Sequence, residues 1–247
     1  PEIVSPNYLY VLVKSDVNYD ADTTTKSSTD IELLVKSQIV VWTLSSLEQF
    51  GRNMRYSKFC KFIDEADDSI LGNETTLTLQ KHVDLTLNQI RSYTIKFENM
   101  IYHPHEGHKS VISSSTFAYT KTDGTVVDAY INDDGNGIMR LFEVVGGENS
   151  YISEDIGTVD YSKGIVSIKD LLPVSVGGNL LKINAIPANK DILSERNVIL
   201  KIDTGSSDSI DVTVNAYDPY SSSTAASSSS TSTSTSTGTS STSSGGY

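Results

Sequence analysis

The chain has 247 residues, of which 19 are basic and 31 acidic, so its formal net charge is −12 at pH 7. This charge repels phosphate backbones, and no basic stripe interleaved with aromatic residues offsets it, which argues against nucleic acid as a partner. No apolar run approaches the ~20 residues that cross a bilayer, so no membrane partner is expected either. The single Cys60 excludes an intramolecular disulfide.

The N-terminal part, residues 1–73, is expected to form one strand followed by a helical segment. The strand covers residues 8–14, and the polar residues after it indicate a loop. Two helices are expected next, a long one and a shorter one over residues 57–66.

The long helix has the clearer boundaries. Thr29 fits its N-cap, because Glu32 lies three residues later as in a capping box. The pattern predicts that the helix ends near Phe50, with Gly51 as its stop. An apolar stripe with spacings of three and four follows the cap: Ile31, Leu34, Val35, Ile39 and Trp42. This stripe is either buried within its own domain or partly docked against another subunit.

Residues 74–220 are expected to form a β-rich domain, because apolar and polar residues alternate there at period two. Two turn sequences, Asp133-Asp134-Gly135-Asn136-Gly137 and Ser162-Lys163-Gly164, are typical of antiparallel hairpins. The predicted class is therefore α+β: a helical N-terminal segment followed by a mainly antiparallel β-rich region.

The last segment, residues 221–247, contains 21 Ser or Thr residues and no charged residue. It offers no apolar pattern that would offset the entropy of ordering its backbone. We therefore expect a disordered tail.

Further segments accompany the hairpins in a fixed order: Tyr8-Leu9-Tyr10, Arg55-Tyr56-Ser57-Lys58-Phe59 and, near the end, Ile186-Pro187-Ala188-Asn189. In this order they resemble the C-terminal region of the large baseplate wedge subunit of contractile-tailed, T-even-like bacteriophages, in the baseplate J-like family. The resemblance covers residues 8–202. Members of that family are much longer, so we expect a C-terminal portion of a larger polypeptide or a shortened relative.

The resemblance implies a structural role. A wedge subunit pairs with a second copy of itself, binds other baseplate wedge and tail proteins, and forms a ring that rearranges when the sheath contracts. It is made and assembled in the host cytoplasm, and it resides in the tail baseplate of the virion. The resemblance brings no cofactor and no catalytic residue.

The alternative is an extracellular β-rich binding or adhesin module with a Ser/Thr-rich linker. An enzyme is not expected, because the sequence has no nucleophile elbow, no phosphate-binding Gly-Lys-Thr or Gly-Lys-Ser loop and no cysteine with a suitable histidine context. The acidic residues at 64–68 are interpreted as a solvated turn.

One loop concentrates metal-binding side chains, because His103, His105 and His108 lie within six residues together with Glu106. Imidazole and carboxylate suit zinc, nickel or copper. Ligands crowded on one short loop have few fixed directions, and no distant partner set completes the sphere. We therefore expect a polar loop without a metal, with these three histidines as the only candidates.

Overall fold

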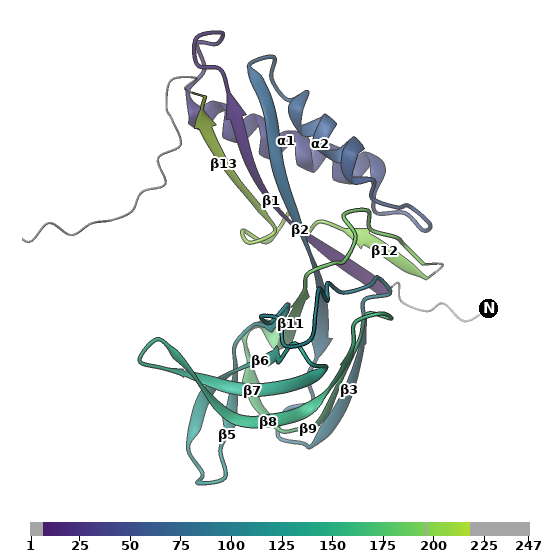
Figure 1. Cartoon of the computed structure of the whole chain (residues 1–247), viewed down its shortest axis with the longest axis vertical. Helices are drawn as coiled ribbons and strands as arrows, with labels where there is room; N and C mark the ends of the chain where they lie inside the picture. The colour runs from purple at the N-terminus through teal and green to yellow at the C-terminus, as the bar shows by residue number, and fades with distance from the viewer. Residues whose placement is uncertain (1–6, 196, 218–247) are drawn as a thin grey trace, which may run out of the picture. The chain divides into compact units, whose positions relative to one another are not determined.

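The structure is a computed structural model that describes residues 7–195 and 197–217. Thirteen strands in this part form one sheet, and its main path runs β12-β1-β2-β11-β4-β6-β7-β8-β9-β3 (Figure 1). Beside this path, β13 pairs with β1, and β5 pairs with β6 and β10. The elements of the first half are β1 (Asn7–Tyr19), α1 (Ser28–Ser46), α2 (Tyr56–Asp64), β2 (Ile70–Asp84), β3 (Arg91–Lys96), β4 (Ile112–Ser114) and β5 (Phe117–Thr120). Those of the second half are β6 (Val126–Asp133), β7 (Ile138–Val145), β8 (Glu148–Asp160), β9 (Ile165–Leu171), β10 (Pro173–Val176), the 3-10 turn η1 (Gly177–Asn179), β11 (Leu180–Ala185), β12 (Val198–Lys201) and β13 (Ile210–Ala216).

Strand β1 joins the two ends of the described chain. It pairs antiparallel with β2 on one side. On the other side it pairs in parallel, first with β12, where Asn7 lies opposite Val198, and then with β13, where Val13 lies opposite Ile210. Alternate residues of β1 are buried, as period-two patterning requires: Leu9, Val11, Val13 and Val17. The last two strands therefore complete the sheet that the first strand begins.

Helices α1 and α2 lie on the same face of β1, β2 and β13 (Figure 1). The N-cap of α1 is Ser27, and the predicted cap at Thr29 is wrong. Ser27 Oγ accepts from the Asp30 N–H at 3.2 Å, and the Asp30 carboxylate accepts from the Ser27 N–H at 2.9 Å, which is a complete capping box. The helix ends at Ser46 rather than near Phe50.

The inner side of α1 packs on the sheet and on α2. Ile31, Val35 and Ile39 are fully buried. Near the end of the helix, the Trp42 ring lies 4.7 Å from the ring of Phe59 on α2. This contact, which also buries Trp42 almost completely, fixes the two helices against each other.

The two predicted hairpins are confirmed. Asp133-Asp134-Gly135-Asn136-Gly137 connects β6 to β7, and Ser162-Lys163-Gly164 connects β8 to β9. Gly164 is needed for two reasons: its φ is +63°, and an added Cβ would lie 2.0 Å from the carbonyl oxygen of Asn99.

The predicted fold class is wrong. The N-terminal part is not a helical segment set before a separate β-rich region, because its strand β1 lies within the same mixed sheet as the later strands. Strand β1 pairs in parallel with β12 and β13, which lie in residues 198–216. The alternation of apolar and polar residues predicts a strand, but it does not predict which distant strand it pairs with. The proposed boundary near Asn73 falls within β2 and stays a prediction. The predicted tail lies outside the described residues.

Candidate interaction surface and polar clusters

Helix α1 presents an uncharged apolar stripe to solvent, which we call the outer face of α1. It consists of Leu33, Leu34, Ser37, Val41 and Leu44. Its exposed fractions are high for apolar side chains: 59% for Leu33, 54% for Val41 and 63% for Leu44. The spacing of four, four and three residues from position 33 to 44 places these side chains on one side of the helix. The helix is therefore apolar on two sides, one packed on the sheet and one facing solvent.

Charges flank this stripe without interrupting it. Glu32 and Lys36 form an ion pair of 2.6 Å one turn apart, and both side chains are only partly exposed. An exposed apolar area rimmed by paired charges is typical of an interaction site.

The histidine loop is built into the fold through two of its three histidines. His108 is 6% exposed, and its Nδ1 lies 2.7 Å from the carbonyl oxygen of Lys109. A carbonyl only accepts, so this nitrogen donates, and Nε2 of the same ring is hydrogen bonded to Nδ1 of His103 at 2.8 Å. His105 is exposed. The sequence did not indicate that two of the three would form a hydrogen-bonded pair.

The His103 ring stacks on Tyr161, with centroids 4.4 Å apart and an interplanar angle of 5°. The Tyr161 hydroxyl in turn donates to Oδ2 of Asp133 at 2.7 Å. Burial, followed by this hydrogen bond to a carboxylate, raises the pKa of Tyr161 above its ordinary value. Tyr161 therefore serves as a neutral donor.

Asp133 is the centre of this cluster and is fully buried. Its Oδ1 accepts from the backbone N–H groups of Val111 and Ile112, both at 2.8 Å. Together with the bond from Tyr161, these contacts tie three segments of chain to one carboxylate. A buried carboxylate that accepts this many hydrogen bonds holds these segments together, so its role here is structural.

The described residues contain no group of three or more His, Cys, Asp or Glu side chains arranged to hold a metal ion. His103 and His108 face each other, and His105 Nδ1 lies 2.9 Å from the Glu106 carbonyl oxygen. The absence of a metal stays a prediction.

The acidic turn after α2 is held by local bonds. Asp67 binds Lys26 and accepts from the hydroxyl of Ser69 at 2.6 Å. These two contacts, with the lysine contributing most, lower the pKa of Asp67 to about 2. Asp64 accepts from the side chain of Asn73 at 2.7 Å. The turn therefore joins α2 to neighbouring loops and strands.

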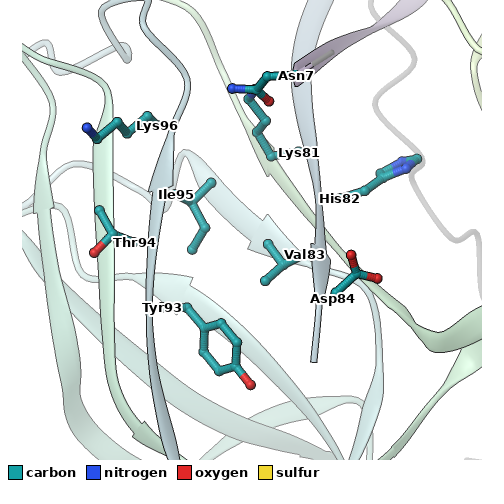
Figure 2. Close-up of a pocket in the computed structure, with 9 residues that line it drawn as sticks. All are labelled: Asn7, Lys81, His82, Val83, Asp84, Tyr93, Thr94, Ile95 and Lys96. Carbon is teal, nitrogen blue, oxygen red and sulfur yellow. The ribbon is translucent and has the colours of Figure 1, made fainter. Parts of the chain in front are cut away.

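A cavity of about 330 Å³ lies between β2 and β3. Figure 2 shows Lys81 and Val83 extending from β2 toward β3, while Tyr93 and Ile95 extend from β3 toward β2. Lys81 is 6% exposed, and its Nζ donates to Asn7 Oδ1 and to the Tyr8 carbonyl, both at 2.8 Å. Burial lowers its pKa to about 8. Sequence reasoning missed this residue, because an isolated lysine in a strand gives no signal of burial.

Among the described residues, no helix is long and apolar enough to cross a membrane. Residues 7–82 match a protein family described as baseplate structural protein gp6, C-terminal domain III. The chain is also similar to the baseplate wedge protein gp6 of Enterobacteria phage T4, with 27% identity over 101 residues. This similarity covers 41% of the chain and 15% of the length of that protein. The resemblance seen in the sequence is confirmed, because residues 7–82 match the model of a C-terminal domain of a baseplate structural protein and a baseplate wedge protein is among the similar proteins.

Proposed function

We propose that this chain is a structural component of a contractile phage tail baseplate, a wedge subunit that contributes binding surfaces rather than catalysis. The observation that carries the proposal is the match of residues 7–82 to the baseplate family. The matched region contains β1, α1, α2 and most of β2, so it includes the outer face of α1. Its partners are other baseplate proteins and a second copy of the chain, and its place is the baseplate of the virion.

The outer face of α1 suits pairing with a second copy. If two α1 helices pack antiparallel around a twofold axis, Leu33 of one copy lies opposite Leu44 of the other, and Ser37 lies opposite Val41. In an antiparallel twofold pair, the numbers of residues that lie opposite each other have a constant sum. Here the sums are 77 and 78, so both contacts agree with one register to within one position. Large side chains then meet near the ends, and a small one meets a branched one near the middle. Such self-complementarity is what a twofold interface requires.

The stripe alone does not supply a complete interface. Its residues from position 33 to 44 span about 16 Å of helix at ~1.5 Å per residue. A stable interface buries upwards of ~1,200 Å² in total. Neighbouring exposed residues must therefore contribute, and the next exposed large apolar residue after the stripe is Phe50, which is 61% exposed just beyond the helix.

Sedimentation of the purified chain tests the pairing. The double variant Val41→Glu/Leu44→Glu places two charges on the outer face of α1, and we expect it to weaken self-association at least a hundredfold. The matched control is Val144→Glu/Val145→Glu on β7, whose side chains are 50% and 58% exposed. Equal self-association of the two double variants would reject the outer face of α1 as the contact.

Location tests the function itself. Antibody labelling of virions is expected to mark the baseplate end of the tail. Labelling of the capsid, or of a cell surface with no tail attached, would reject the wedge role and favour the adhesin alternative.

A further inference from the structure

One face of strands β6, β7 and β8 carries a row of three aromatic side chains, which we call the aromatic row: Tyr130, Phe142 and Tyr151. Tyr130 lies opposite Phe142, and Phe142 lies opposite Tyr151. Their ring centroids are 5.6 and 6.0 Å apart. Neighbouring residues such as Ile131 and Leu141 alternate to the other face and are buried in the core. The row therefore stands on the face that turns away from the core.

The aromatic row is the centre of an exposed apolar surface. Tyr151 is 39% exposed, and Tyr130 and Phe142 are partly exposed. On β7, Ile138 and Val144 lie an even number of residues from Phe142, so they share its face. Their exposed fractions are 38% and 50%. A contiguous exposed apolar surface of this kind is typical of an interaction site.

Arg140 is held in place beside the row. Its Nη2 donates to the carbonyl oxygen of Asp133 at 2.8 Å, and its Nε donates to Asn132 Oδ1 at 3.3 Å. The guanidinium carbon lies 4.5 Å from the centroid of the Tyr151 ring. Tyrosine and arginine are enriched among the residues that dominate binding energy at interfaces. Side chains that are already held in place lose little freedom on binding, so the row is preorganised for a partner.

The strands around the row are strongly acidic. Residues 116–156 contain eight acidic and two basic residues. Neither basic side chain cancels the excess, because Lys121 pairs with Glu143 at 2.9 Å and Arg140 is held beside the row. Four exposed carboxylates lie on β6 and β8, and we call them the acidic rim: Asp128, Glu148, Glu154 and Asp155.

We propose that the aromatic row and the acidic rim dock a basic segment of another protein, in which lysine or arginine flanks an apolar side chain. The apolar side chain covers the rings, while the cations pair with rim carboxylates or lie over an aromatic face. Twofold pairing of two copies through this surface is disfavoured, because it brings two acidic rims together. The surface lies outside residues 7–82, so the inference goes beyond the baseplate role and does not rest on it.

Nuclear magnetic resonance of the purified full chain tests the proposal with a defined probe. The probe is a short peptide in which lysine alternates with leucine. One comparison peptide replaces every lysine with glutamate, and another replaces every leucine with serine. We expect the probe to shift the amide signals of residues 126–156, and each comparison peptide to bind at least about tenfold more weakly.

Two variants separate the contribution of the row from that of the rim. Tyr151→Ser removes the exposed ring, and we expect it to weaken binding of the probe at least about tenfold, as loss of an aromatic anchor does. Glu148→Gln/Glu154→Gln removes two charges from the rim, and we expect about fivefold weaker binding at low salt. The matched control Glu74→Gln/Glu195→Gln removes the same charge from exposed positions elsewhere and is expected to leave binding unchanged.

Any of three results overturns the proposal. The signals shifted by the probe lie outside residues 126–156, or the control variant weakens binding as much as Glu148→Gln/Glu154→Gln does. The third is that Tyr151→Ser weakens self-association of the chain and leaves binding of the probe unchanged, since the occupant is then a second copy. None of these results bears on the place of the chain in a virion, which antibody labelling tests separately.

Discussion

Gly164 and Gly146 form a matched pair that isolates the effect of one close backbone approach. Both lie in hairpin connections, and their φ angles are +63° and +62°. They differ in their surroundings: a Cβ at Gly164 would lie 2.0 Å from the Asn99 carbonyl oxygen, whereas nothing lies within 4 Å of a Cβ at Gly146. Alanine at either position incurs the same left-handed backbone strain, about 1–2 kcal/mol.

The overlap adds a second cost only at Gly164. To relieve it, the turn and the Asn99 segment must move apart. Three hydrogen bonds are then at risk: Phe97 N–H to the Gly164 carbonyl at 2.8 Å, and the two between the Asn99 side chain and the backbone of Leu193 at 2.9 and 3.0 Å. At about 1 kcal/mol each, these bonds bring the expected loss for Gly164→Ala to about 4–5 kcal/mol, against about 1–2 kcal/mol for Gly146→Ala.

Urea denaturation followed by circular dichroism measures both losses, and the slope of the transition shows whether the unfolded state has changed. We expect the midpoint of Gly164→Ala to fall well below that of Gly146→Ala at an unchanged slope. If the two variants differ by less than about 1 kcal/mol, within the spread of such strain values, the reasoning from the Asn99 contact is wrong.

Three further predictions concern titration and the histidine loop. The bonds of Asp67 to a lysine and a serine hold its pKa at about 2, below the value of ~3.9 in the unfolded chain. The stability that ionised Asp67 gives the fold is therefore present above pH ~4 and is lost as the pH falls toward about 2. Acid titration of Asp67→Asn should lack this loss of stability. Burial lowers the pKa of Lys81 from 10.5 to about 8. Between these pH values the unfolded state binds more protons than the folded state, so the free energy of unfolding should rise with pH there. If Lys81→Met shows the same dependence of stability on pH as the parent chain, this prediction is contradicted. Replacing both His103 and His108 with Ala should cost about 1–3 kcal/mol of stability, because the histidine pair and the stacking on Tyr161 are lost. His105→Ala serves as the neutral control. A chelator should affect neither the parent chain nor the variant, and a chelator-sensitive melting temperature in the parent chain would instead reveal a metal.

The parts of the fold that local sequence determines were predictable. The hairpin at Ser162-Lys163-Gly164 follows from turn residues between alternating strands, and α1 follows from its apolar spacing. Its cap was misplaced by two residues, because Ser27 and Thr29 both suit an N-cap and only the backbone geometry selects between them.

Features that depend on distant contacts were not predictable in the same way. The burial of Lys81 depends on acceptors from Asn7 and Tyr8, more than seventy residues away. The predicted stripe on α1 looked like one apolar surface, and only the position of the sheet separates buried Val35 from exposed Leu34. The sequence left open whether this stripe is buried or docked, and the structure shows a buried side and an exposed side.

The parallel pairing of β1 with β13 also determines how the described region resists tension. The two strands are hydrogen bonded over seven consecutive pairs, from Val13 opposite Ile210 to Tyr19 opposite Ala216. A pull on the chain before Asn7 and on the chain after Ala216 acts at opposite ends of this ladder, along the strands. The bonds are then loaded together in shear and do not open one after another, as they would in a hairpin pulled at its open end. Force transmitted through the backbone would thus meet a mechanical clamp.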